Sequence, residues 1–486
     1  MNVTTWRAGH LAGIDAADVG WHALTFTAHG RALRVEVPVI DVQQMRSLTR
    51  AVRLAAREHL QSMSVDAIIE LLGSAVARLL DPTDAHRREL DELLPLVTGF
   101  DAEMVQLGLT TYLQGFRAPQ LRRFVAEDFA NPKVLDGFQP AVKGGAVRAF
   151  GPSLLAHVWA GNVPGLPLWS LACGLLVKAG NIGKLPSAEP VFISVFTRLL
   201  AELHPPLRDA IAIVWWKGGE AGVDVALFGE AETVVAYGSN AALRDVRDRV
   251  PVTTRFLPHG HKLGVALVAR AALDRVHGPA NARLAARDIT RHEQQGCYAP
   301  HVVYVERGGE VSPRDFAHHF AAELNNIEHR HPARVLTLEE AAAVAGWRQA
   351  AEWNDRMELL GEEGCGWAVV YSTELGPFAP TPGHRCVLVS PLDSLEHVVS
   401  LLAPHAAVLQ TVGMATTPDA LYPLAEQLGR AGVTRIAPLG AMAQPEAGWH
   451  HDGRFNLADL VRMVEIDAAT ERAADRLAPY AQEELP

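Results

Sequence analysis

Short apolar segments alternate with helical patterns through the middle of the chain, and this alternation limits the possible folds more than any other feature. Leucine, isoleucine and valine fill short runs, and the segments between them carry apolar residues at helical spacing. Parallel strands need helical crossovers and are buried on both faces. The pattern therefore predicts an α/β fold with a Rossmann-type parallel sheet, an architecture that binds nucleotides. The strands expected are Leu154–Val158, Ile182–Leu185, Ala210–Trp215, Thr233–Tyr237 and Lys262–Ala269.

The length of 486 residues exceeds one ordinary core, so we expect more than one domain. A mostly helical N-terminal region (1–135), which opens with a hairpin over His22–Thr27 and Arg31–Val37, is expected to pack on a nucleotide-binding domain (136–262). A second α/β domain (263–450) contains Cys297, and a C-terminal tail (451–486) ends in a charged helix. The strands expected in the second domain are His301–Glu306, Trp367–Tyr371, Cys386–Ser390 and Val408–Val412.

Composition excludes several classes of partner. A net charge of −11 and a pI near 6.0 argue against nucleic acid. The longest apolar stretch (153–180) contains polar residues and prolines, so we expect no membrane span. The four cysteines are scattered, without CxxC or HExxH spacing, so no metal site is expected. Free thiols and the absence of a secretory signal favour a cytoplasmic location.

Cys297 is the first candidate for chemistry. It follows a polar turn (291–296) and precedes an expected strand, so its thiol could lie at the mouth of a cleft. Gly296 allows the backbone to approach a ligand closely, and a backbone N–H at such a turn can help to hold an oxyanion. The alternative is a buried structural cysteine, which is how most free cysteines behave and how we interpret Cys173 and Cys386.

Three further features lie at the ends of expected strands or helices. Asn162 occupies a Gly-Asn-Val-Pro turn, where its amide can donate to an oxyanion or simply form an Asx turn. Lys184, one of only six lysines, ends a strand where nucleotides bind in parallel sheets, unless it is a solvated surface residue. Gly238 and Ser239 open a helix whose N–H groups can meet a pyrophosphate, although no GxGxxG motif is present.

Taken in order, these motifs resemble the aldehyde dehydrogenase superfamily. They are Asn162-Val-Pro, Lys184-Leu-Pro-Ser-Ala-Glu, Tyr237-Gly-Ser and Gln295-Gly-Cys. The run from His157 to Pro167, together with Gln294-Gln-Gly-Cys, Leu409-Gln-Thr-Val-Gly and Gly432-Val-Thr-Arg-Ile, is similar to the acyl-CoA reductase family of the bioluminescence fatty acid reductase. The resemblance spans roughly 146–467.

The resemblance implies a role for each matching position. Cys297 would accept the acyl group, and Asn162 with the Cys297 backbone N–H would form the oxyanion hole. Lys184, Ser187, Gly238 and Ser239 would bind the cofactor. That cofactor would be NADPH, with NADH possible, since Glu189 lies close to Lys184 and could repel a 2′-phosphate. The substrate would be an acyl-CoA or an acyl-carrier thioester, with a possible acyl-protein synthetase as partner, and the enzyme would be a homo-oligomer.

One departure from the superfamily pattern favours thioester reduction. Ordinary aldehyde dehydrogenases carry a glutamate, in a Glu-Leu-Gly-Gly-Lys segment, that activates the hydrolytic water; the matching stretch here (258–264) has none. His259 or His261 could act there as acid or base, although a histidine in a turn is more often only solvated. The alternative functions are an oxidising aldehyde dehydrogenase, a cysteine acyltransferase or thioesterase, and a non-catalytic acyl-binding protein.

Overall fold

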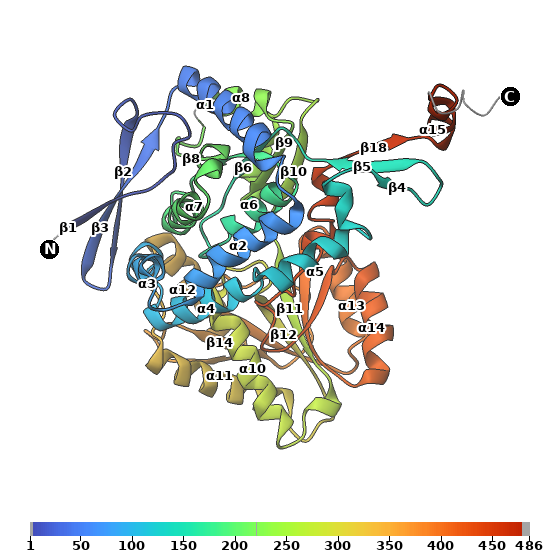
Figure 1. Cartoon of the computed structure of the whole chain (residues 1–486). Helices are drawn as coiled ribbons and strands as arrows, with labels where there is room; N and C mark the ends of the chain where they lie inside the picture. The colour runs from blue at the N-terminus through green and yellow to red at the C-terminus, as the bar shows by residue number, and fades with distance from the viewer. Residues whose placement is uncertain (1–2, 220, 479–486) are drawn as a thin grey trace.

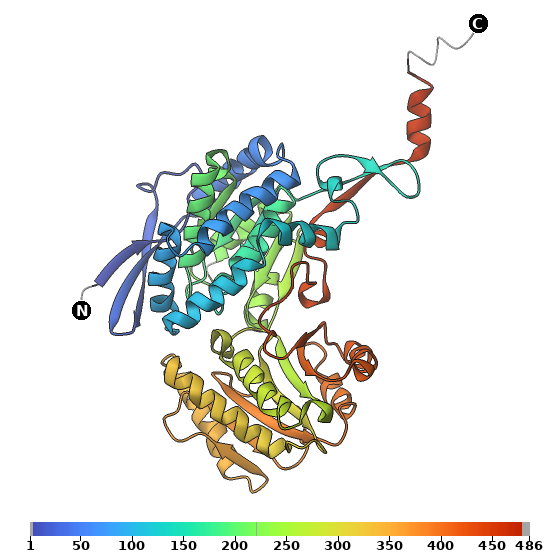
Figure 2. The same ribbon diagram turned by 60° about the horizontal axis from the view of Figure 1, so that its bottom comes forward.

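The computed structural model describes residues 3–219 and 221–478, which form two lobes, each with its own central sheet (Figures 1 and 2). The first sheet has the order β10-β9-β6-β7-β8, and all of its strands are parallel. The chain runs outward from β6 to β8 and then returns to the other side of β6, as in a doubly wound nucleotide-binding sheet. The predicted Rossmann-type sheet is thus confirmed. Its strands are β6 (Leu154–Val158), β7 (Gly180–Lys184), β8 (Ile211–Val214), β9 (Thr233–Tyr237) and β10 (Arg255–His259).

Helices cover both faces of this sheet. They are α6 (Pro167–Leu176), α7 (Val191–Leu203), α8 (Ala221–Glu230) and α9 (Asn240–Arg247). Nearly every residue of α6 is buried, because the N-terminal helix α2 (Val65–Leu80) packs over it. After α6 the turn is made by Lys178, in a left-handed conformation, and Gly180 belongs to β7. A Cβ at Gly180 would lie 2.9 Å from Val52 of the helix α1 (Val42–Ala55).

The N-terminal region adds a small sheet and further helices to the first lobe. The predicted hairpin is confirmed by β2 (Gly20–Ala28) and β3 (Arg31–Val39), which pair antiparallel, while β1 (Val3–Arg7) runs parallel to β3. Apolar residues at helical spacing explain the packing of the helices, since their buried faces join the core of the first lobe. The remaining elements are the single π-helical turn η1 (Ala56–Leu60), α3 (Ala85–Thr98), α4 (Ala102–Gln114), α5 (Ala118–Asp128) and the 3₁₀ turns η2 (Pro132–Leu135) and η3 (Pro205–Ala210).

The second lobe is built on a sheet of order β13-β14-β15-β12-β11-β16-β17. Its strands are parallel except β13, which pairs antiparallel with β14 at the edge. The strands are β11 (Leu263–Val268), β12 (Pro300–Glu306), β13 (Met357–Leu360), β14 (Ala368–Ser372), β15 (Cys386–Leu392), β16 (Leu409–Ala415) and β17 (Arg435–Pro438). The helices are α10 (His277–Thr290), α11 (Pro313–Arg330), α12 (Leu338–Glu352), α13 (His397–Leu402) and α14 (Pro418–Arg430), with short 3₁₀ turns η4 (Arg270–Ala272) and η6 (Ala403–His405).

After β17 the chain returns to the first lobe instead of ending as an extended tail. Leu457 and Leu460 are buried in the core of that lobe. Strand β18 (Arg462–Ile466) pairs antiparallel with β5 (Ala146–Phe150), next to β4 (Gln139–Pro140), and α15 (Ala468–Asp475) follows (Figure 2). The 3₁₀ turns η7 (His451–Gly453) and η8 (Ala458–Leu460) lie on the returning segment. The end of the expected tail, residues 479–486, lies outside the described residues.

A search of the described helices for one long and apolar enough to cross a membrane gave no candidate.

Candidate active site

Cys297 lies in the loop between the 3₁₀ turn η5 (Arg291–Gln294) and β12, and its side chain is half-buried. The loop is therefore neither sealed in a core nor fully in solvent. The sequence suggested that Gly296 makes room for a ligand. The structure gives that room to Tyr298 instead, because a Cβ at Gly296 would lie 2.3 Å from the tyrosine ring. The glycine allows the chain's own tyrosine to pack against the backbone beside Cys297.

The three residues at the start of this loop adopt an uncommon backbone conformation. His292, Glu293 and Gln294 have φ values of 50°, 53° and 60°, all in the left-handed region. For residues other than glycine each such conformation costs about 1 kcal/mol or more, and successive ones are rare. Surrounding contacts must therefore hold the loop that carries Cys297.

Buried polar contacts supply that restraint. Arg385, which is fully buried, donates to Glu293 at 2.5 Å and to Glu328 at 2.8 Å. The Gln294 amide donates to the backbone oxygens of Pro300 and Cys386, both at 2.9 Å. These contacts tie the loop to α11 and to the first residues of β12 and β15, two neighbouring strands in the interior of the second sheet.

Asn162 reaches the same loop from the first lobe. It follows β6, and its Nδ2 donates to the backbone oxygen of Gln295 at 2.7 Å. Gly161 precedes it, and a Cβ there would lie 2.7 Å from the backbone nitrogen of Glu189. Asn162 and Cys297 are 135 positions apart in the sequence, yet they belong to two loops that contact each other.

The thiol of Cys297 lies beside a polar group that sequence reasoning did not assign to the site. This group is the Gln410 amide, on β16, and its position next to the sulfur favours the thiolate. Burial and the negative charge of Asp452 act in the opposite direction, and Arg435 offsets them only in part. The net effect raises the pKa of Cys297 to about 12, so the resting thiol is protonated near neutral pH.

His259 ends the edge strand β10 rather than lying in a turn. Its Nδ1 donates to Asp452 Oδ2 at 2.8 Å, and its ring stacks on those of Tyr237 and His451. Burial and the neighbouring His259 lower the pKa of His451 to about 3, so His451 is neutral at pH 7. His261, in contrast, is exposed and lies near His301, so the structure brings only the first of the two predicted histidines into the network beside Cys297.

The same histidines bring potential metal-binding atoms together. Donor atoms of His259, His451 and Asp452 all lie within 4.8 Å of one another. An ion bound through an imidazole nitrogen lies in the plane of that ring. The two rings are stacked at 4.5 Å with only 14° between their planes, so they do not converge on one ion.

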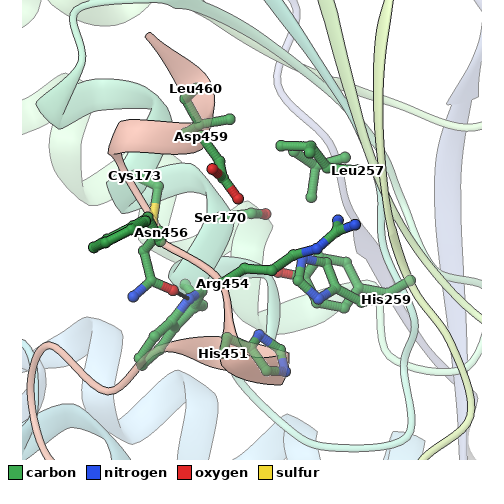
Figure 3. A pocket seen from close by; sticks show the side chains of 13 residues that line it. Ser170, Cys173, Leu257, His259, His451, Arg454, Asn456, Asp459 and Leu460 are labelled. Atoms are coloured by element: carbon green, nitrogen blue, oxygen red, sulfur yellow. Dashed lines mark hydrogen bonds between the residues drawn. The ribbon is translucent and has the colours of Figure 1, made fainter. Parts of the chain in front are cut away.

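A small cavity of about 30 Å³ lies next to this stack, between α6, the ends of β9 and β10, and the returning C-terminal segment (Figure 3). At this volume it has room for a water molecule. Figure 3 shows Cys173 on the opposite side of the cavity from His259. Cys173 is buried, and burial raises the pKa of its thiol well above the usual range, which fits its interpretation as a core residue. The lining residues are Trp169, Ser170, Cys173, Val235, Tyr237, Leu257, His259, His451, Arg454, Phe455, Asn456, Asp459 and Leu460.

The predicted cofactor residues lie at the carboxyl ends of β7 and β9. Lys184 lies over the ring of Trp216 at 5.0 Å, and Ser187 accepts a hydrogen bond from Trp215. Ser239 caps α9 by accepting from Ala242. The start of α9, preceded by Gly238, therefore lies at the carboxyl end of β9. The strand order of the sheet reverses at this point, between β6 and β9.

Glu189 does not face the cofactor edge as the sequence suggested. Its side chain is buried and accepts hydrogen bonds from the backbone N–H groups of Val191 and Phe192, both at 2.8 Å. Burial raises its pKa to about 7. The carboxyl group serves the start of α7, so a charge repelling a 2′-phosphate is not its role here.

Several residues of the recognised motifs have packing roles instead. His157 is buried between Asn181 and Ser170, at 3.0 and 3.1 Å, and burial lowers its pKa to about 4. Trp159 donates to Ser170 and covers Gly183, where a Cβ would meet its ring. These contacts fasten α6 to the sheet just behind the Asn162 turn.

Two members of the site were missed from the sequence, although each had a signal. Gln410 lies within the Leu409–Gly413 motif as a polar residue in an apolar strand. Asp452 follows the pair His450-His451. An acidic residue next to two histidines, in a segment poor in regular structure, could have marked it for attention.

Comparison with known proteins supports the family resemblance that the sequence motifs indicated. The acyl-CoA reductase (LuxC) family matches residues 60–463. The long-chain acyl-protein thioester reductase 2 of Photobacterium leiognathi is 23% identical over 445 residues, covering 89% of this chain and 87% of the relative. The long-chain acyl-protein thioester reductase of Photobacterium phosphoreum is 22% identical over 459 residues, covering 93% of this chain and 88% of the relative.

Solved structures of aldehyde dehydrogenases share the fold. Aldehyde dehydrogenase 21 of Physcomitrella patens, in complex with succinate, aligns with a TM-score of 0.72 and 12% identity, covering 96% of this chain and 99% of its own. Aldehyde dehydrogenase C of Pseudomonas syringae, solved with NAD⁺ and octanal, gives 0.72 and 13%, covering 95% and 96%. The fold is therefore aldehyde dehydrogenase-like, as expected. The chain belongs to the acyl-CoA reductase (LuxC) family, a family of acyl thioester reductases.

Proposed function

We propose that this protein reduces an acyl-CoA, with a long acyl chain, to the aldehyde through an acyl group held on Cys297. The observation that carries the proposal is the contact between the Asn162 amide and the loop of a half-buried Cys297. A thioester carbonyl placed between these loops would meet a sulfur nucleophile and an amide donor together. Family membership and the missing glutamate support reduction over acid formation.

The oxyanion would be held by donors from both lobes. One N–H of the Asn162 amide is used by Gln295, and the amide carries a second N–H for the substrate oxygen. The backbone N–H of Cys297 is the other donor. Removing one donor of this kind typically costs about 3 kcal/mol of barrier. The Gln295 contact fixes the orientation of the amide before substrate arrives.

Proton movement is assigned to His259. Asp452 accepts from Nδ1, so in the neutral ring Nε2 is the basic nitrogen. In the proposed sequence Nε2 takes the proton of Cys297 as the sulfur attacks the thioester carbon. The proton then passes to the leaving thiolate as the carbon–sulfur bond of the substrate breaks. A base is needed because the resting thiol is protonated near neutral pH.

The cofactor site is assigned to the carboxyl edge of the first sheet, within residues 136–262. The strand order reverses between β6 and β9, and a crevice at such a point is where open α/β sheets bind nucleotides. Lys184 and Ser187 would bind the adenosine ribose, and Gly238 and Ser239 the pyrophosphate. When bound, a reduced nicotinamide supplies the hydride that takes the acyl-cysteine to the aldehyde level. We propose NADPH, because the only nearby acid that counted against a 2′-phosphate, Glu189, is turned to the start of α7.

Two kinds of thioester are candidates for the acyl donor, and we propose acyl-CoA as the first. The curated relatives are named for long-chain acyl-protein thioesters, which makes an acyl-carrier or synthetase-bound thioester the second candidate donor. A reducing cytoplasm would keep Cys297 as a free thiol, and we propose that compartment and a homo-oligomeric enzyme.

The test follows cofactor oxidation by absorbance with a panel of acyl-CoAs and acyl-protein thioesters, using NADPH or NADH in parallel. The expected result is acyl-dependent consumption of NADPH with release of aldehyde. The Cys297→Ala variant should neither consume NADPH nor retain radiolabelled acyl group, whereas Cys173→Ala, the matched buried cysteine, should do both. Release of CoA without NADPH oxidation would indicate an acyltransferase or thioesterase. Production of acid from aldehyde and NAD⁺ would indicate an oxidising dehydrogenase, and labelled Cys297→Ala protein would overturn the nucleophile.

A further inference from the structure

Gln410 is a polar side chain in an otherwise apolar strand. It lies on β16 with only 1% of its surface exposed, between Leu409, which is equally buried, and Thr411. Burying an amide is costly unless its donors and acceptor are hydrogen-bonded. Its partners therefore explain why an amide occupies this position.

Those partners link the nucleophile to the histidine stack. Gln410 Nε2 donates to Asp452 Oδ1 at 2.7 Å, and the same side chain lies beside the Cys297 thiol. The other carboxylate oxygen of Asp452 accepts from His259 Nδ1 at 2.8 Å. Hydrogen bonds thus run from Gln410 through Asp452 to His259, and Gln410 lies beside the sulfur.

Asp452 is held in a fixed pose for this purpose. Its φ of 55° places it in the left-handed region, where aspartate and asparagine are among the better tolerated residues. Burial opposes its ionisation, but the hydrogen bonds from His259 and Gln410 outweigh burial and hold the pKa of Asp452 below its usual range. A carboxylate rather than a carboxylic acid therefore lies between the two partners.

We propose that Asp452 and Gln410 are positioning residues for the nucleophile. Asp452 fixes the Gln410 amide with one oxygen and the His259 tautomer with the other, and the remaining N–H of Gln410 holds the Cys297 sulfur. The inference deepens the proposed function, on which it rests for the role of His259. It assigns opposite effects on the sulfur to the two residues, because the amide stabilises the thiolate and the carboxylate destabilises it.

The charged and titratable groups around the sulfur make this difference measurable. Cys297 faces Asp452 from the returning C-terminal segment, Arg435 from β17, and Tyr298 from its own loop. Replacing Asp452 by Asn removes the only negative charge in this set and keeps an oxygen for the Gln410 amide. Replacing Gln410 by Met keeps the side-chain length but removes the donor.

The experiment measures alkylation of Cys297 by iodoacetamide between pH 7 and 10, with peptide mass spectrometry to separate the four cysteines. Cys365 is also half-buried and serves as an internal reference, whereas Cys173 and Cys386 are buried. Gln410→Met should slow alkylation of Cys297 about tenfold, the loss expected for a hydrogen bond to a charged group, with Cys365 unchanged. Asp452→Asn should accelerate it severalfold.

Turnover should separate from reactivity in the Asp452→Asn variant. An asparagine amide facing His259 Nδ1 favours the tautomer with its proton on Nε2, so the base is lost. Acyl reduction should then fall about 100-fold or more while the thiol becomes more reactive. A purely structural role would lower both.

Two results would overturn the inference: an unchanged alkylation rate in Gln410→Met, or slower alkylation in Asp452→Asn. Asparagine is well tolerated at a left-handed position, so the Asp452→Asn arm decides the sign even if Gln410→Met does not fold. Alkylation requires neither acyl donor nor cofactor. If the parent consumed no NADPH with any thioester, the proposed function would fail while these arms still tested the positioning.

Discussion

The two loops that meet at the active site are held in different ways. The Asn162 turn follows a buried strand, and Gly161 lies so close to the backbone at Glu189 that it leaves no room for a Cβ. The Cys297 loop begins with three left-handed residues, none of them glycine, and depends on a buried arginine. Asn162 is therefore placed largely by packing within the first lobe, whereas Cys297 is placed by charges from distant parts of the chain.

We expect the greatest loss of stability when the buried ion pair that holds the Cys297 loop is broken. Arg385→Met would leave Glu293 buried without its partner, so the free energy of unfolding should fall by about 3–5 kcal/mol. Denaturant titration measures this. Arg356→Met is the matched control, since the exposed Arg356–Glu374 pair should contribute about 1 kcal/mol or less. Equal losses in the two variants would contradict the assigned role of the buried ion pair.

Removal of the amide tests the other loop through rate rather than stability. Asn162→Ala should lower kcat about 100- to 1,000-fold, because both the oxyanion donor and the Gln295 contact are lost. The KM for the acyl donor should change little. Steady-state kinetics measures both quantities, and an unchanged kcat would return Asn162 to a simple turn residue.

A smaller effect is expected from crowding the Asn162 turn. In Gly161→Ala the new Cβ would meet backbone at Glu189, which cannot rotate away, so stability should fall by about 1–3 kcal/mol. Gly346→Ala is a suitable control, because its Cβ would meet no atom within 4 Å. Thermal unfolding of the two variants distinguishes local packing from a general effect of losing glycine. A Gly161→Ala protein as stable as the control would contradict the packing account.

The smallest effect concerns pH. The folded pKa of Glu189, about 7, lies above its unfolded value, so the folded state binds more protons between the two values. Its contribution to stability is therefore greatest at low pH and is lost as pH rises toward 7. Glu189→Gln should reduce the fall in stability between pH 6 and pH 8 by about 1 kcal/mol. Urea titrations at both pH values measure it, and a larger fall in the variant would reverse the sign.

Sequence periodicity predicted most of the first sheet, because buried parallel strands are short continuous apolar runs. Strands β6 and β9 lie at the predicted bounds. Strand β10 was missed, since Pro258 and the polar residues after it are typical of a turn, and only an edge strand tolerates such a proline. The end of α6 carries no glycine signal, because its turn uses Lys178 in a left-handed conformation.

The site was predictable where a motif carries the chemistry and hidden where long-range contacts do. Cys297 and Asn162 were found because each lies in a short recognisable turn. Gln410 and Asp452 make their contacts across 42 and 193 positions, to each other and to His259, and no local pattern reveals such pairing. The left-handed segment was equally hidden, because nothing in His292-Glu-Gln signals it without Arg385.

The return of the chain to the first lobe has a consequence for biosynthesis. Asp452 and the strand β18 that anchors its segment are translated after the whole second lobe. Domains emerging from the ribosome fold in order from the N-terminus. A nascent chain contains every strand of both central sheets before Asp452 is made. On the proposed positioning role, Cys297 therefore reaches its final reactivity only in the last steps of synthesis.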